Sequence, residues 1–200
     1  PAGGGEAVVH VTPSATLNSL ELLERGKLLK RSATAIVSRL PLHISERAIG
    51  TLRSKLGWKK KELATEEVNS RGPGNVILAR LEFEKLTEMF IGFGEKGVSA
   101  ERVAGRVAKD ISAYLKCNAP AGEHLTDQLL LPLGIAAHQG QTSRFRGTGV
   151  SGHTQTHIEV LKSFLGIEVE SSMDDDGGAA TFTLRPHGSD ESSLSSDRTK

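Results

Sequence analysis

Hydrophobic positions recur along the chain with two different periods. Apolar residues spaced three and four apart predict amphipathic helices at about 44–56, 99–117, 122–137 and 153–165. Alternating and β-branched runs predict strands at about 6–12, 27–40, 75–83, 86–93, 141–148, 167–171 and 179–185. Gly57 and Gly166 each follow a predicted helix, as is typical of left-handed C-terminal caps. The pattern therefore predicts a mixed α and β fold.

The predicted segments fall into two blocks. One block runs over about Leu20–Lys116, and the other consists of the first strand and everything after Pro120. The connection Ser14–Gly26 contains the string LELLERG, which fits either a short helix or an extended crossing. We therefore expect an α+β chain built as two-layer α/β sandwiches. Residues 187–200 are rich in Ser and Asp, which predicts a disordered tail.

The segment Gly122–Ala137 predicts a helix that is apolar on nearly every side. Such a helix belongs in a core, and Pro132 is expected to kink it. Its first turns carry His124, Asp127 and Gln128, and this spacing places the three side chains on one face. The cluster is either a ligand site or a satisfied structural hydrogen-bond network. The residues by themselves favour neither interpretation.

The stretch Gly149–Gly166 changes from a loop of small residues into a helix. His153 lies at that change, where backbone N–H groups of a helix N-terminus attract phosphate. A histidine that is exposed and yet held in place suits a nucleophile or an acid–base group. On this stretch alone, an ordinary histidine at a helix start is the favoured interpretation. His157 follows one turn later, but two such ligands without a third do not make a metal site.

Composition and charge narrow the class of protein. The chain has 200 residues, 37% of them hydrophobic, and a net charge of +1, so any basic surface must be local. Its single cysteine, Cys117, is expected to pack as a small apolar side chain in a reducing compartment. No apolar run approaches the ~18 residues of a membrane span. Lys59–Lys61 fit a solvated basic turn better than a phosphate contact, and Arg144 and Arg146 are expected on one covered strand face.

Six short strings in a fixed order carry a more specific signal. They are PAGGG before a strand, LPLHISERAIGTL, SRGPGN, GFGEKGVSAE, GEHLTDQLLLPL and SGHTQTHIEV. Over about Pro1–Val169 the chain thereby resembles the RNA 3′-terminal phosphate cyclase family.

The resemblance implies a fold. Residues 1–19 and 118–186 would form the last strand–helix repeat of an architecture akin to EPSP synthase. Residues 20–117 would form a small inserted α/β domain. The earlier, N-terminal repeats of the family fold would then be missing from this sequence, which begins at Pro1.

The resemblance also implies an activity, the ATP-dependent conversion of an RNA 3′-phosphate end to a 2′,3′-cyclic phosphate. The family's Ser-x-His-x-x-Thr segment aligns with His153 and Thr156, which makes His153 the catalytic residue that carries AMP. Asp127 and Gln128 match the family's Asp-Gln pair near the nucleotide, with His124 beside them. ATP and Mg²⁺ (or Mn²⁺) are the implied cofactors, and Asp127 is the implied metal ligand.

The flanks of His153 depart from the family pattern. Gly152 precedes it after Val-Ser rather than Pro-Ser, and His157 stands where Asn is common. The loop 138–149 is also longer and more polar than the family's short turn, and neither its role nor that of His157 follows from the sequence. Two alternatives to the enzyme therefore stay open: a non-catalytic relative acting in ribosome assembly, and an inactive fragment. The expected location is the cytoplasm, or the nucleus in a eukaryote, without a membrane partner.

Overall fold

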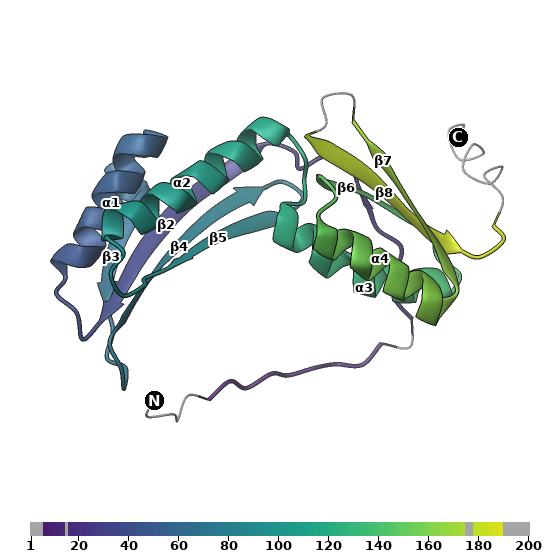
Figure 1. The fold of residues 1–200 in the computed structure, drawn as a ribbon, viewed down its shortest axis with the longest axis horizontal. Helices are drawn as coiled ribbons and strands as arrows, with labels where there is room; N and C mark the ends of the chain where they lie inside the picture. The colour runs from purple at the N-terminus through teal and green to yellow at the C-terminus, as the bar shows by residue number, and fades with distance from the viewer. Residues whose placement is uncertain (1–5, 15, 175–177, 190–200) are drawn as a thin grey trace. The chain divides into compact units, whose positions relative to one another are not determined.

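Two four-stranded sheets, each with two helices on one face, make up the described part of the chain (Figure 1). The structure is a computed structural model that describes residues 6–14, 16–174 and 178–189. The chain divides into two compact units, Pro1–Val11 with Arg25–Asn118 and Thr12–Glu24 with Ala119–Lys200. We call residues 25–118 the first unit, and residues 16–24 with the described residues after 118 the second unit. The predicted mixed α and β class is confirmed.

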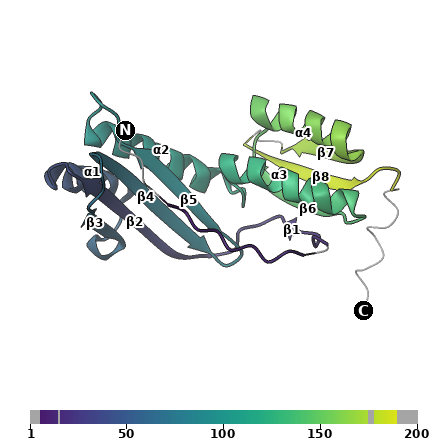
Figure 2. The ribbon, with the colours of Figure 1, turned by 90° about the horizontal axis from the view of Figure 1, so that it is seen from below.

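The first unit is a twisted sheet in the order β3-β2-β4-β5. Its strands are β2 (Leu28–Ser38), β3 (Leu63–Glu67), β4 (Gly74–Phe83) and β5 (Thr87–Phe93). β2 and β3 are parallel and are joined through helix α1 (His43–Leu56), whereas β4 runs antiparallel to both β2 and β5. Figure 2 shows α1 and α2 (Ala100–Cys117) on the same side of this sheet. The hairpin predicted at Glu84-Lys85 is confirmed.

The core of the first unit follows from the strand alternation. Ile77, Ala79 and Leu81 of β4 are at most 1% exposed and face the helices. Gly92 of β5 lies so close to α2 that a Cβ there would be 2.6 Å from Val107. A larger residue at position 92 would therefore push the helix off the sheet.

The second unit has the sheet order β1-β6-β8-β7. Its strands are β1 (Glu21–Leu22), β6 (Ser143–Thr148), β7 (Ile167–Met173) and β8 (Ala179–Pro186). β1 pairs with β6 in parallel, so the LELLERG string is an extended crossing. Helices α3 (Glu123–His138) and α4 (Gly152–Leu165) cover the face that holds Phe145 and Phe182, whose rings stack at 4.9 Å (Figure 1).

The predicted helix ends agree closely with the structure. Ser99 caps α2 by accepting the backbone N–H of Arg102, and Gly57 and Gly166 end α1 and α4 in the left-handed region. None of the helices in the described ranges has the length and apolarity needed to cross a bilayer.

Three expectations were wrong. Glu6–Thr12 forms no strand: these residues pair with no described strand, and Val8 and Val9 are 69% and 78% exposed. Strand β3 was missed because its LATEE sequence is polar and exposed, as an edge strand tolerates. Helix α3 is not buried on all sides, since Leu131 is 50% exposed. Most of the predicted tail, residues 190–200, lies outside the described part of the chain.

Candidate active site

A chain of hydroxyl and carboxyl groups joins the start of α3 to the start of α4. The Thr154 hydroxyl donates to Asp127 Oδ1 at 2.7 Å and lies 2.9 Å from the Ser151 hydroxyl. Ser151 is the N-cap of α4, and its Oγ accepts the backbone N–H of Thr154 at 3.1 Å. Thr154 is only 1% exposed, so this link is protected from competition by water. The two stretches singled out in the sequence, 27 residues apart at these positions, thus meet.

His153 is exposed and precedes the buried Thr154 directly. It belongs to the first turn of α4, where the leading backbone N–H groups have no partner within the helix. The N-cap bond and the Asp127 bond hold the residue next to it in place. The prediction of a histidine at a fixed helix N-terminus, open to a ligand, agrees with this geometry. Its catalytic role stays a prediction.

Of the three polar side chains predicted on one face of α3, only one takes part in the hydrogen bond between α3 and α4. Asp127 is half-buried and engaged, whereas His124 and Gln128 are exposed. Among the described residues, neither His124 nor Gln128 makes a side-chain hydrogen bond or ion pair. They are therefore available to a ligand. A structural hydrogen-bond network of all three side chains, the alternative that the sequence allowed, is not what these two residues form.

Two buried hydroxyls near the start of α3 have no partner. Thr126 Oγ1 and Thr148 Oγ1 are the buried side-chain oxygens of the described residues that make no hydrogen bond. Thr126 packs against Gly147 of β6, where a Cβ would lie 2.2 Å from Thr126 Oγ1. Unsatisfied buried hydroxyls are uncommon and typical of sites that complete their hydrogen bonds with a water or ligand. The sequence contains no signal for this pair.

Arg144 and Arg146 lie on the face of β6 opposite Phe145, away from α3 and α4. The Arg146 guanidinium makes an ion pair with Asp174, with its Nε 2.9 Å from Asp174 Oδ2. The expectation that both arginines share one strand face is confirmed. Their side chains point away from the helix-covered face.

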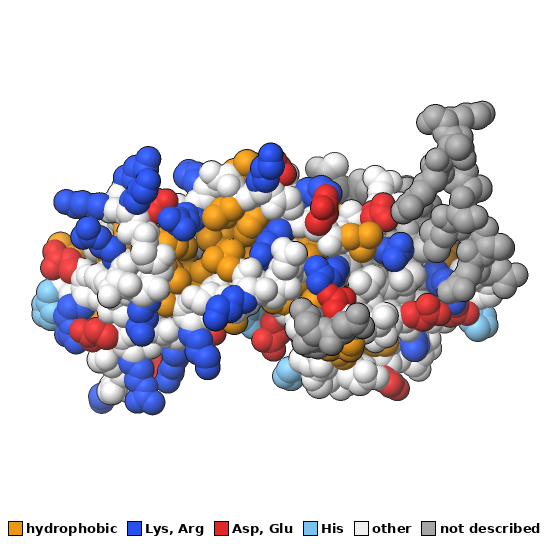
Figure 3. Space-filling view, turned by 90° about the horizontal axis from the view of Figure 1, so that it is seen from above, with side chains coloured by type: hydrophobic (Ala, Val, Ile, Leu, Met, Phe, Trp, Pro, Cys, Tyr) orange, Lys and Arg blue, Asp and Glu red, His pale blue; other side chains and the backbone are white. Residues whose placement is uncertain are grey.

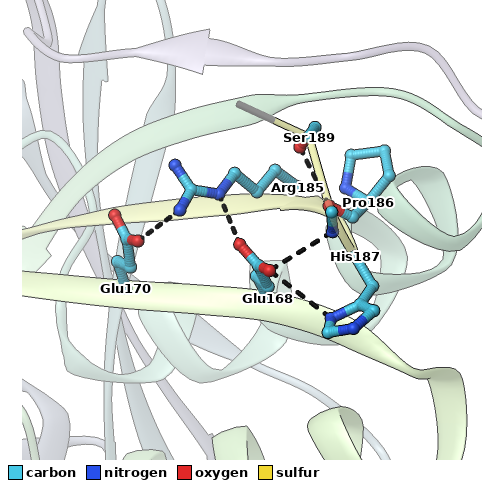
Figure 4. A network of polar contacts seen from close by, with 7 residues as sticks. Glu168, Glu170, Arg185, Pro186, His187 and Ser189 are labelled. Carbon is cyan, nitrogen blue, oxygen red and sulfur yellow. Dashed lines mark hydrogen bonds and ion pairs between the residues drawn. The ribbon is translucent and has the colours of Figure 1, made fainter. Parts of the chain in front are cut away.

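A second polar cluster lies where β7 begins and β8 ends (Figure 4). Arg185 Nε donates to Glu168 Oε2 at 2.7 Å, and its Nη2 donates to Glu170 Oε1 at 2.6 Å. The bond from Arg185, followed by that from the Gly188 N–H, holds the pKa of Glu168 below its ordinary value. His187 Nδ1 lies 3.4 Å from Glu168. These groups satisfy one another, so the cluster is structural.

The donor set near α4 limits what it could hold. No group of three or more His, Cys, Asp or Glu side chains in the described ranges could enclose a metal ion by itself. Mg²⁺ often keeps its waters and binds through one or two carboxylates plus substrate phosphates. Asp127 Oδ1 accepts from Thr154, and Oδ2 has no hydrogen bond to any residue that the structure describes. The residues therefore fit a metal that arrives with a polyphosphate, and the helix N-terminus fits the polyphosphate itself.

His153 is an exposed histidine in the first turn of a helix, next to a threonine that bonds a carboxylate, and this arrangement on an α/β sandwich is compatible with a site that handles phosphate. Comparison with known proteins makes this specific. Residues 23–116 match the family model "RNA 3′-terminal phosphate cyclase (RTC), insert domain". The chain is 38% identical over 177 residues to the RNA 3′-terminal phosphate cyclase of Salmonella enteritidis, covering 88% of this chain and 51% of the relative.

Two further relatives give the same result. The RNA 3′-terminal phosphate cyclases of Koribacter versatilis and Pseudomonas aeruginosa are 36% and 37% identical, over 188 and 179 residues. These alignments cover 92% and 89% of this chain and 51% of each relative. The chain therefore belongs to the RNA 3′-terminal phosphate cyclase family. It spans about half the length of the curated relatives it matches.

Proposed function

We propose that this chain is part of an RNA 3′-phosphate cyclase and contributes the residue that carries AMP. The observation that supports this most directly is the hydrogen bond from Thr154 to Asp127. It ties the helix start next to His153 to the helix that carries Asp127 and Gln128. Family membership gave these residues a role, and the geometry makes their joint action physically reasonable.

The proposed chemistry uses His153 as a nucleophile. An imidazole nitrogen attacks the α-phosphorus of ATP, so a P–N bond forms as the bond to pyrophosphate breaks. An oxygen of the RNA 3′-phosphate then displaces the imidazole and takes the AMP group. Finally the neighbouring 2′-hydroxyl loses its proton, attacks the 3′-phosphorus and expels AMP, which leaves the 2′,3′-cyclic phosphate.

Other residues of the site have positioning roles in this proposal. The free N–H groups at the start of α4 would stabilise phosphate oxygens near His153. Asp127 would hold Mg²⁺ or Mn²⁺, which offsets the charge of the triphosphate. Gln128 and His124 are exposed side chains of the same helix and would contact the nucleotide.

The proposal includes the finer architecture. Residues 1–19 and 118–186 would form the last repeat of an EPSP-synthase-like fold, and residues 20–117 would form the insert. The match of 23–116 to the insert domain and the boundary between the two units near residue 118 support the insert, whereas residues 1–11 group with the first unit and residues 20–24 with the second. The part of the relatives not covered by this chain would then supply the N-terminal repeats that complete the site around His153. The proposed location is the cytoplasm, or the nucleus in a eukaryote, and the single cysteine of this chain is compatible with a reducing compartment.

The direct test is covalent labelling. The chain and its full-length parent are incubated with ATP labelled at the α-phosphorus and Mg²⁺, and acid-labile protein-bound AMP is measured. We expect His153→Ala to abolish the label and the matched control His157→Ala, one turn along α4, to retain it. Label that survives His153→Ala would refute the nucleophile assignment.

The same experiment separates the alternatives. Label on the parent but not on the 200-residue chain would show that the chain is inactive without the other repeats. A parent that takes no label, with no cyclic phosphate formed on a 3′-phosphorylated RNA, would favour the non-catalytic relative.

A further inference from the structure

The near-neutral net charge of the chain conceals a strong separation of charge. Residues 25–118 contain 19 of the 25 Lys and Arg residues but only 10 of the 24 Asp and Glu residues, a net charge of +9. The remaining residues contain 6 against 14, a net charge of −8. A small domain is usually kept in solution by a net charge of about 2–8. The net charge of the first unit lies just above this range.

Most of this excess lies in α1, in the short segment that follows it as far as Lys61, and in α2. The segment from α1 to Lys61 carries six cations and one carboxylate, and α2 carries four cations and two carboxylates. α1 and α2 lie side by side over one face of the sheet (Figure 1). Figure 3 shows blue Lys and Arg side chains spread over this part of the molecule. The outer surface of the helical layer is thus a basic face.

The cations of α2 form a continuous ridge. Arg102, Arg106, Lys109 and Lys116 are all exposed and follow helical spacing, with only the small Ala113 between the last two. At about 1.5 Å per residue the ridge is about 21 Å long. A nucleic-acid strand with one phosphate per about 3.4 Å would present roughly six phosphates over that length.

α1 adds a further cation to this ridge. Lys55 extends across to α2, where its Cε is 3.6 Å from the position that a Cβ of Gly105 would take. Gly105 itself stands between Arg102 and Arg106 in the sequence of the helix. We call Lys55, Arg102, Arg106, Lys109 and Lys116 the basic ridge.

Ion pairing within the protein does not account for the ridge. In the described part of the chain, only Arg106 of these five side chains makes an ion pair, to Glu95 at 3.0 Å. Of the carboxylates on α2, Glu101 is held by Arg47 through two hydrogen bonds, and Asp110 is exposed beside the ridge. Four cations of the ridge are thus unpaired against one free carboxylate.

Local helix stability accounts for Lys116, which lies in the last turn of α2, but not for the whole ridge. Arg102 lies in the first turn of α2, where the helix dipole disfavours a positive charge. A surface that keeps unpaired cations at such a position is typical of one that meets an anionic partner.

We propose that the basic ridge binds the sugar–phosphate backbone of RNA away from its 3′ end. The proposal rests on the proposed function, because that function makes RNA the polyanion this chain meets. The ridge contains no aromatic side chain on which bases could stack and no paired amides to read base edges. Its contacts are therefore with phosphates, so binding through it is independent of sequence and sensitive to salt.

The test uses the 200-residue chain and a fluorescent 20-nucleotide RNA that ends in a 3′-hydroxyl, without ATP. This probe offers no 3′-phosphate, so binding does not depend on the chemistry of His153. The ridge variant is Arg102→Gln/Lys109→Gln/Lys116→Gln, which keeps good helix formers. The matched control, Lys27→Gln/Lys30→Gln/Arg80→Gln, removes three exposed positive charges from the same unit outside the helical layer, since Arg80 alternates on β4 with Ala79 and Leu81, which face the helices.

Fluorescence anisotropy across a salt series gives the result. For single strands, each phosphate contact adds about 0.7 to the steepness of log K against log salt. Loss of three cations should therefore make this slope shallower by about 2 in the ridge variant. If the two proteins bind RNA equally at 1 M salt, this difference in slope makes the ridge variant bind about a hundredfold more weakly than the unmutated chain at 0.1 M salt. The control variant should keep the slope of the unmutated 200-residue chain. Ultraviolet cross-linking of the unmutated 200-residue chain should place the RNA on peptides of α2.

Three outcomes would overturn the proposal. The first is that the unmutated 200-residue chain binds no RNA at low salt. The second is an equal loss of RNA affinity in the ridge and control variants. The third is that all cross-links fall in the second unit. The labelling of His153 by ATP requires no RNA. Its failure would therefore count against the cyclase proposal and leave the binding result standing.

Discussion

The buried hydroxyl of Thr154 offers the sharpest test of the candidate site. Thr154→Val keeps the volume and removes the O–H that donates to Asp127 Oδ1 at 2.7 Å. A hydrogen bond to a charged group contributes about 1.5–3 kcal/mol, and Thr154 is only 1% exposed, so water cannot replace it easily. We expect the free energy of unfolding of the second unit to fall by about that amount.

Urea unfolding followed by far-ultraviolet circular dichroism measures this change. The single tryptophan, Trp58, is 3% exposed in the first unit, so its fluorescence reports a transition that Thr154→Val should leave in place. Thr156→Val is the matched control, because Thr156 is exposed and, within the described ranges, its hydroxyl bonds only to the Gly152 carbonyl of its own helix. Its effect should be within about 0.5 kcal/mol.

A double-mutant cycle decides whether the effect belongs to this bond. Thr154→Val and Asp127→Ala each remove one partner, and their combination should show a coupling energy of about 1 kcal/mol or more. Additive effects would mean that the two groups do not interact, and the link between α3 and α4 would be refuted. Loss of the link should also slow the labelling of His153, because Thr154 follows it in the chain.

Three further predictions concern the folded units. Gly147→Ala places a Cβ 2.2 Å from Thr126 Oγ1 and should cost about 1–3 kcal/mol in urea unfolding; an unchanged midpoint would mean that α3 shifts freely. Ser99→Ala removes the acceptor for the Arg102 N–H and should cost about 1 kcal/mol by tryptophan fluorescence, with Ser99→Asp restoring it; equal loss in both variants would contradict the cap. Burial raises the pKa of Tyr114 from 10.0 to about 12, so the unfolded state loses its proton first. The stability this gives the first unit is present below pH 10 and lost as the pH rises toward 12, and Tyr114→Phe should abolish that dependence; a dependence that persists would assign it to another group.

Much of the secondary structure could be predicted because it depends on local rules. The face of α1, the hairpin between β4 and β5, and the caps at Ser99, Gly57 and Gly166 follow from residue spacing and backbone preferences. β3 could not be predicted, since its polar residues form a strand only because β2 offers a parallel partner. The opposite holds for Glu6–Thr12, whose strand-like pattern finds no described partner.

The candidate site shows the same division. The sequence indicated His153 through its place between small residues and a helix, and Asp127 with Gln128 through their resemblance to the family. Ser151 could have been identified as a cap from the sequence, since a serine at the end of a glycine-rich loop and directly before a helix is a common helix start. Thr126 had no signal, because its unpartnered hydroxyl results from close packing against β6.

The sequence by itself determined which helices form, where they end, to which family the chain is similar, and which histidine is the candidate nucleophile. These properties depend on neighbours within a few residues or on strings kept in order. Only the tertiary structure decided that Thr154 bonds Asp127 and that the cations of α2 line up beside Lys55. Both depend on how helices 27 or more residues apart pack against a sheet, and residue spacing within one helix contains no information about its neighbour.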